Sequence, residues 1–268
     1  MKPIMFFAAV AFYVGSVAGN QAQEKYPIGS GKIVGGQPST ISENPWLAAL
    51  IIDRPDGSFL CAGSFISSRW ILSAAHCFGN SDTSIRVHVK ANSTDYMKEG
   101  SWVEAARFVV HPNYDPNTHE HDIAMLQVPT TIRAKVIPMA AASTPLAPGE
   151  PLLVAGWGVL NEAGQRTTTL MKATVPYVDN ATCNLPQSYD GKIRDTMMCA
   201  GENGGGVDSC QGDSGGPLVK GTKAEEAILV GIVSFGDGCA EKLKYGVYTR
   251  VSTERNWIIE QLNPSSSK

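Results

Sequence analysis

Residues Asp208–Pro217 read DSCQGDSGGP, and this stretch decides how the rest of the chain is interpreted. Three glycines surround Ser214 within it. Glycines at this density let the backbone come close to a bound molecule and leave N–H groups pointing toward it. The plain alternative is a surface turn, the usual place of glycine- and serine-rich sequence. If Ser214 is instead a nucleophile, it needs a general base from elsewhere in the chain.

The positions of the histidines separate two kinds of serine nucleophile. Gly212 to Gly216 also fits the nucleophile elbow of α/β-hydrolases, in which the histidine follows the serine along the chain. The five histidines stand at positions 76, 88, 111, 119 and 121, so none follows Ser214. An α/β-hydrolase esterase is therefore excluded, and the base for Ser214 has to come from upstream.

Length and composition indicate a globular protein with a substantial core. The chain has 268 residues, 43% of them hydrophobic, which suits one large domain or two small ones. The net charge of −3 argues against a nucleic-acid-binding protein. Short apolar runs divided by turn residues, with 27 glycines and little helical periodicity, favour an all-β fold. A proline-rich connector, Pro129–Pro151, is a candidate boundary between two halves.

The N-terminus predicts a secreted, extracellular protein. Lys2 precedes the apolar run Ile4–Val14, and small residues follow up to Ala18, so residues 1–18 are expected to be a signal peptide. That run is short for a membrane span, and no later stretch is long enough, so no membrane anchor is expected. Residues 19–32 are polar and are predicted to be a propeptide. In a secreted protein the six cysteines predict disulfides, with 15 pairings open.

Few stretches look helical. Ser252 is a candidate N-cap of a C-terminal helix at about 252–262, with Trp257, Ile258 and Leu262 on a shared face. A short turn of helix is expected within 179–185.

Two motifs upstream of Ser214 offer the missing partners. SAAHC, Ser73–Cys77, places His76 directly after an apolar run, and HDIAML, His121–Leu126, places Asp122 at the start of a predicted strand. A carboxylate at such a buried edge needs a partner, because a lone buried charge is costly. An imidazole N–H is a suitable partner. Taken alone, Asp122 would be better explained as a solvated aspartate at a strand start.

Taken together, SAAHC, HDIAML and GDSGGP occur in the order His, Asp, Ser and resemble the trypsin/chymotrypsin family of serine proteases. The resemblance extends from Ile33 to Leu262. It implies an all-β fold of two packed six-stranded antiparallel β-barrels, with the catalytic groups at their junction and a C-terminal helix. The protease domain is expected at 33–268, with barrels at about 47–135 and 150–251.

The same resemblance assigns catalytic roles. Ser214 is the expected nucleophile, His76 the general base and acid, and Asp122 the group that orients the imidazole. The backbone N–H groups of Gly212 and Ser214 are expected to form the oxyanion hole. No cofactor and no metal ion are expected.

Substrate preference and activation also follow from the resemblance. Asp208 stands at the floor of the primary specificity pocket, which implies cleavage after Arg or Lys. The other substrate-binding positions are Ser234, Phe235, Gly236 and Gly246, with Phe235 where many relatives have tryptophan. Cleavage after Lys32 would release the Ile33 ammonium group, which is expected to pair with Asp213 and order the oxyanion loop. The activator would be another trypsin-like protease or the enzyme itself.

The resemblance selects one disulfide pattern and several further expectations. The pairs are Cys61–Cys77, Cys183–Cys199 and Cys210–Cys239, and a further bridge of some relatives is replaced by Leu152 and Lys220. Tyr245 leaves open a sodium site, whereas a calcium site in the loop Arg86–Asn92 is not expected. The remaining sequence features are two glycosylation sequons, at Asn92 and Asn180, and four histidines expected to be ordinary surface or core residues, at 88, 111, 119 and 121.

The expected partners are polypeptide substrates with Arg or Lys before the cleaved bond and protein protease inhibitors, with no nucleic acid or membrane partner and a monomeric state. The rival function is that of a catalytically inactive family member that only binds partners. Such a protein usually lacks a triad residue, whereas all three are present here.

Overall fold

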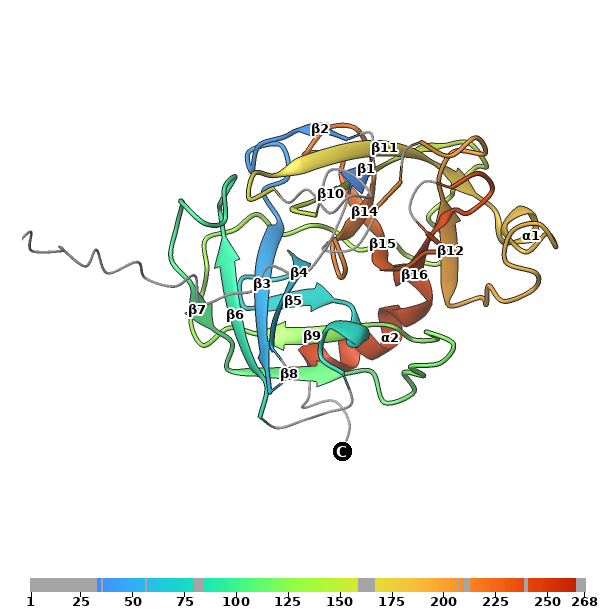
Figure 1. Ribbon diagram of the computed structural model, residues 1–268. Helices are drawn as coiled ribbons and strands as arrows, with labels where there is room; N and C mark the ends of the chain where they lie inside the picture. Colours follow the sequence, from blue (N-terminus) through green and yellow to red (C-terminus); the bar gives the residue numbers. More distant parts are fainter. Residues whose placement is uncertain are drawn as a thin grey trace, which may run out of the picture.

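The computed structural model describes residues 33–34, 36–55, 57–79, 84–158, 167–206, 208–209, 213–238 and 241–263, and of residues 33, 34, 208 and 209 it describes only the backbone. Most of these residues lie in strands or in the turns that connect them (Figure 1). The all-β class predicted from the short apolar runs is confirmed.

Seven strands of the first half form one antiparallel sheet in the order β7-β6-β3-β4-β5-β9-β8. Their bounds are β3 (Leu47–Arg54), β4 (Gly57–Phe65), β5 (Trp70–Ser73), β6 (Arg86–Ala91), β7 (Val103–Glu104), β8 (Arg107–Val110) and β9 (Ala124–Gln127). The two edge strands, β7 and β8, are consecutive pieces of one extended segment. Between them, Ala105 N donates to Val87 O at 2.8 Å and Ala106 N to Gln127 O at 2.7 Å. This segment therefore joins both ends of the sheet and closes a six-stranded barrel.

The second half closes in the same way. Its sheet has the order β10-β14-β15-β16-β12-β11-β2, and β10 also pairs with β11, so six strands form a ring to which β2 is added. The bounds are β2 (Gln37–Pro38), β10 (Pro151–Gly156), β11 (Met171–Val178), β12 (Met197–Ala200), β14 (Pro217–Lys220), β15 (Ile228–Phe235) and β16 (Gly246–Arg250). Both predicted six-stranded barrels are thus confirmed. A separate two-stranded sheet pairs β1 (Ile33–Val34) with β13 (Asp208–Ser209).

The strand β3 shows how the two barrels pack. Its first six residues are all buried, although a strand with one solvent face alternates between buried and exposed positions. Leu50 and Ile52 belong to the core of the first barrel. Leu47 faces the other way, in a cluster with Trp157 and Leu170 of the second half. The apolar run of β3 is continuous because side chains on one face of the strand fill the core of the first barrel, and those on the other face fill the junction between the barrels.

The C-terminal helix α2 (Val251–Leu262) starts one residue before the predicted start. The prediction that Ser252 caps it is wrong. Arg250 holds the cap position without a side-chain cap bond, because β16 stays paired through Arg250 and the helix follows it at once. Trp257, Ile258 and Leu262 pack on the core of the first barrel, as their shared face predicted.

The predicted turn of helix within 179–185 is present as α1 (Asn180–Cys183). Asp179 caps it by accepting a hydrogen bond from Thr182 N at 2.9 Å. None of the helices in the described ranges has the length and apolar character needed to cross a membrane.

Candidate active site

His76 lies in the 3-10 helix η1 (Ala75–Cys77), directly after β5. Two contacts fix this short element. The disulfide Cys61–Cys77 joins it to β4, and Arg54 donates from Nη2 to the carbonyls of His76 and Cys77. These contacts hold the backbone of His76 and so limit the orientations of its ring.

Asp122 is fully buried at the end of the turn that leads into β9. Its neighbour His121 has a φ of 54°, a value that few residues other than glycine adopt. Thr249 of the second barrel donates from Oγ1 to the Asp122 carbonyl at 2.7 Å. The backbone of Asp122, which belongs to the first barrel, is thus also held by the second barrel, at the junction of the two.

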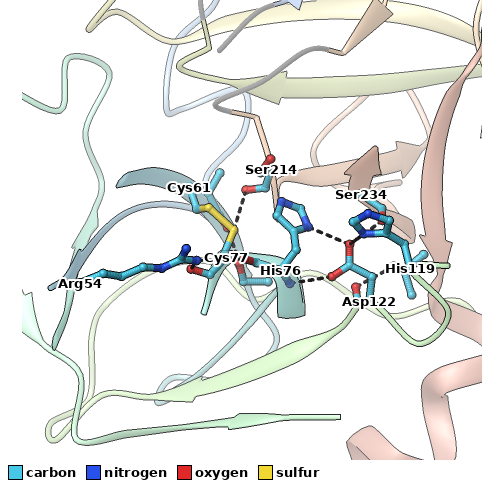
Figure 2. A network of polar contacts seen from close by, with 11 residues as sticks. Arg54, Cys61, His76, Cys77, His119, Asp122, Ser214 and Ser234 are labelled. Carbon is cyan, nitrogen blue, oxygen red and sulfur yellow. Dashed lines mark hydrogen bonds and ion pairs between the residues drawn. A yellow bond between two sulfur atoms is a disulfide. The ribbon is translucent and has the colours of Figure 1, made fainter. Parts of the chain in front are cut away.

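The Asp122 carboxylate accepts three hydrogen bonds that aim the His76 ring (Figure 2). His76 Nδ1 lies 2.8 Å from Oδ2, and the His76 backbone N donates to Oδ1, also at 2.8 Å. Ser234 donates from Oγ to Oδ2 at 2.5 Å. Because an ionised carboxylate only accepts hydrogen bonds, Nδ1 of His76 carries the proton and Nε2 keeps its lone pair.

Ser214 lies on the side of the His76 ring away from Asp122 in Figure 2. Its carbonyl accepts a hydrogen bond from Ala62 N at 2.8 Å and lies 3.8 Å from Cys77 Sγ, beside His76. Gly215 follows with a φ of 78°, and a Cβ there would collide with Ser73 Oγ and the Ala62 carbonyl. Only glycine fits this position, which explains one glycine of the opening motif.

The pKa values of the imidazole and the carboxylate move apart. Burial lowers the pKa of His76, but the charge of Asp122 and the hydrogen bond to it raise that pKa by more, so it lies above its usual value of 6.5. Burial raises the pKa of Asp122, but contacts with His76, His119 and Ser234 lower it by more. The carboxylate stays ionised at neutral pH, and the imidazole beside it becomes a stronger base.

A comparison with known families agrees with this arrangement. A family model described as Trypsin matches residues 33–258. The chain belongs to the trypsin family of serine proteases. The predicted resemblance is confirmed.

Several curated proteins are similar to this trypsin-family chain. It is 38% identical to transmembrane protease serine 11E of Mus musculus, over 85% of this chain and 54% of that protein. It is 37% identical to human serine protease 56, over 89% of this chain and 40% of that protein. It is also 37% identical to human transmembrane protease serine 11B, over 94% of this chain and 60% of that protein. The chain therefore spans about half the length of these curated relatives.

The structure places the predicted substrate-binding residues only in part. Ser234 and Phe235 end β15, and Gly246 is buried at the start of β16. At the exposed Gly236 a Cβ would meet Gly238 O at 3.5 Å, and among the described residues no other atom lies within 4 Å of it. Asp208 is described only as backbone in β13. Lys32, Gly212, Cys210 and Cys239 lie outside the described residues.

His119 was expected to be an ordinary surface or core residue, but it lies at the site of this trypsin-family chain. Its Nδ1 is 3.8 Å from Asp122 Oδ2, and its ring is 6.1 Å from that of His76 and 5.0 Å from that of Phe235. Nδ1 is buried and has no hydrogen-bond partner within the described ranges. The sequence feature that could have predicted this location is the spacing. His119 stands three residues before Asp122, in a turn that points both side chains the same way.

Two predicted disulfides are present, Cys61–Cys77 and Cys183–Cys199, while the third pair falls outside the described residues. Leu152 and Lys220, expected to replace a further bridge, face each other across β10 and β14.

Glycosylation at both sequons stays a prediction, although their side chains differ. Asn92 donates one hydrogen bond, to Arg133 O at 3.0 Å. Asn180 donates to Arg194 O and Met197 O and accepts from Arg250. A glycan on Asn180 would cost at least one of the two donated bonds, since it replaces one of the two hydrogens on Nδ2.

Proposed function

We propose that this chain is a secreted serine endopeptidase that cleaves polypeptides after Arg or Lys. The observation that supports it most is the buried Asp122 carboxylate bound to His76 Nδ1, with Ser214 across the ring. Secretion is proposed from the signal-like residues 1–18, and the specificity from Asp208.

In the proposed reaction, Ser214 Oγ attacks the carbonyl carbon of the substrate while His76 Nε2 takes the hydroxyl proton. Asp122 stabilises the imidazolium that forms. The tetrahedral intermediate then collapses, the C–N bond breaks, and His76 gives its proton to the leaving amine. A water molecule attacks the acyl-enzyme by the same route, which releases the acid and restores Ser214. The backbone N–H groups of Gly212 and Ser214 would stabilise the oxyanion.

Activation by cleavage after Lys32 is part of the proposal. In support of this, Ile33 pairs with Ser209 and Val34 with Asp208, five and six residues before Ser214 in the sequence. Asp213 is fully buried there, and Gly158 N donates to its Oδ1 at 3.0 Å. A Cβ at Gly156 would collide with the Asp213 carboxylate, so the glycine makes room for it. We propose that the Ile33 ammonium group pairs with Asp213 and acts as a switch.

Active-site titration with an organophosphate tests the proposed function and its activation together. The full chain is expected to titrate poorly before treatment with a trace of a trypsin-like protease. After treatment it should begin at Ile33 and bind one equivalent at Ser214. A cleaved, folded chain that takes up no label would instead identify the rival, an inactive binding protein. Equal labelling before and after cleavage would exclude the zymogen.

Substituting the proposed pocket carboxylate tests the specificity. Asp208→Ser is expected to lower kcat/KM for cleavage after Arg by about 30-fold to several thousandfold, because a cationic side chain would lose its charge partner. The readout is kcat/KM on matched peptides with Arg or Leu before the cleaved bond. The control is Asp237→Ser, which changes an exposed aspartate paired with Lys244. An unchanged preference for Arg in Asp208→Ser would exclude the pocket assignment.

A further inference from the structure

A second cluster of titratable side chains lies outside the proposed catalytic residues. It consists of His111, just after β8, His121, just before Asp122, and Glu254 in the first turn of α2. His121 Nδ1 lies 3.1 and 3.2 Å from the two carboxylate oxygens of Glu254, and His111 Nε2 lies 3.5 Å from Oε2. One ligand atom from each residue lies within 4.8 Å of the others. The cluster joins two segments that are 133 residues apart.

Burial makes this cluster unusual. The side chain of Glu254 is only 2% exposed and that of His111 only 8% exposed, whereas that of His121 is 28% exposed. A buried carboxylate is costly unless a cation or several hydrogen bonds compensate its charge. Two imidazoles and one carboxylate are also ligands that Zn²⁺ takes in proteins.

We propose that His111 Nε2, His121 Nδ1 and the Glu254 carboxylate form a binding site for a divalent transition-metal ion, with Zn²⁺ as the best match. Zinc–ligand bonds of about 2.0–2.2 Å in tetrahedral geometry place the ligand atoms about 3.3–3.6 Å apart. The two separations from Glu254, 3.1–3.2 and 3.5 Å, lie near this range. A water molecule would take the fourth position, on the exposed side of His121.

Binding requires one local movement. The rings of His111 and His121 stack at 4.5 Å between centroids and 6° between planes. An ion lies in the plane of each imidazole that binds it, so two parallel rings cannot both reach it. His111 is held by Trp257, at 4.8 Å between ring centroids, so His121, the more exposed ring, is the one that tilts. His111 also gives up the bond from Asn113 N to its Nδ1, since that nitrogen then carries the proton.

The second metal-compatible group, His76, His119 and Asp122, belongs to the proposed catalytic site. The two groups share one turn, since His121 lies between His119 and Asp122 in sequence. An ion at His111, His121 and Glu254 would tie this turn to α2 and so fix the backbone that carries Asp122. From the sequence, His111 and His121 had no expected role as ligands, because the carboxylate that lies beside them comes from a distant helix.

Zinc titration of the full chain carrying Ser214→Ala tests the site whether or not the proposed protease function holds. After treatment with a chelator, the protein is titrated with Zn²⁺ by calorimetry and with Co²⁺ by visible absorption. Binding of one ion per chain is expected, with a higher Tm. Glu254→Gln and His121→Asn are each expected to weaken binding by at least about tenfold. Asparagine tolerates the positive φ at position 121, so His121→Asn still tests the site if Glu254→Gln fails to fold.

The matched control is His119→Asn, which makes the same change at another positive-φ histidine two residues away. It should leave the affinity for zinc unchanged. Loss of binding in His119→Asn alone would place the ion at the catalytic group and overturn the proposal. So would equal affinity in all variants, or no binding by the parent chain.

Discussion

Ser214→Ala is expected to lower kcat by about 10⁶-fold, to the level left by substrate binding and the oxyanion hole alone. The physical reason is that Ser214 Oγ is the proposed nucleophile, and without this hydroxyl the proposed acyl-enzyme cannot form. His76 would keep its bond to Asp122, but its Nε2 would have no hydroxyl from which to take a proton. The measurement is pre-steady-state hydrolysis of a chromogenic ester by the chain cleaved after Lys32, in which the burst of the first product should vanish.

The control for this prediction is Ser252→Ala. Ser252 lies on α2 and is not its cap, so its hydroxyl has no role in the proposed reaction. This variant should keep a full burst, and thermal unfolding of both variants should match that of the parent chain. A burst that survives in folded Ser214→Ala would mean that another residue is the nucleophile.

Short motifs in the sequence were sufficient to predict which residues meet at the candidate site. SAAHC, HDIAML and GDSGGP together predict His76, Asp122 and Ser214 as site residues, and the structure brings His76 and Asp122 into contact, while their catalytic roles stay a proposal. The six-stranded barrels followed from the family resemblance, and the strand pairings confirm them.

Other features depend on contacts between distant segments, which no local pattern records. The start of α2 depends on how far β16 stays paired with β15, so a good capping residue at 252 was misleading. His119 reaches the site because Phe235, from the second barrel, stacks on its ring. Glu254 joins His111 and His121 only because α2 packs back onto the first barrel.

Asp122→Asn is expected to lower kcat by about 10⁴-fold while leaving the fold intact. The asparagine amide can donate to His76 Nδ1, and the imidazole then carries its proton on Nε2, where it cannot accept one from Ser214. The burial of position 122 favours a neutral residue of the same shape, whereas an amide group in place of Oδ2 loses the hydrogen bond that Ser234 donates. These two effects oppose each other, so stability should change little compared with catalysis.

The pH profile separates this electrostatic role from a purely structural one. As the proposed general base, His76 must be neutral to act, so activity in the parent chain is expected to be lost as the pH falls through a pKa that Asp122 holds above 6.5. In Asp122→Asn the charge that raises this pKa is gone while burial still lowers it, so the acid limb of the residual activity should move to lower pH.

The matched control for Asp122→Asn is Asp53→Asn, because the first barrel contains a second His–Asp pair. His88 Nε2 lies 3.2 Å from Asp53 Oδ2, and both side chains are partly exposed. That substitution should leave both kcat and the acid limb unchanged. An acid limb that stays in place in Asp122→Asn would mean that the carboxylate holds His76 in position without tuning its basicity. Unchanged kcat in Asp122→Asn would mean that Asp122 has no part in the mechanism. Asp53→Asn is a suitable control because the two His–Asp pairs differ mainly in burial and in the presence of Ser214 beside one of them.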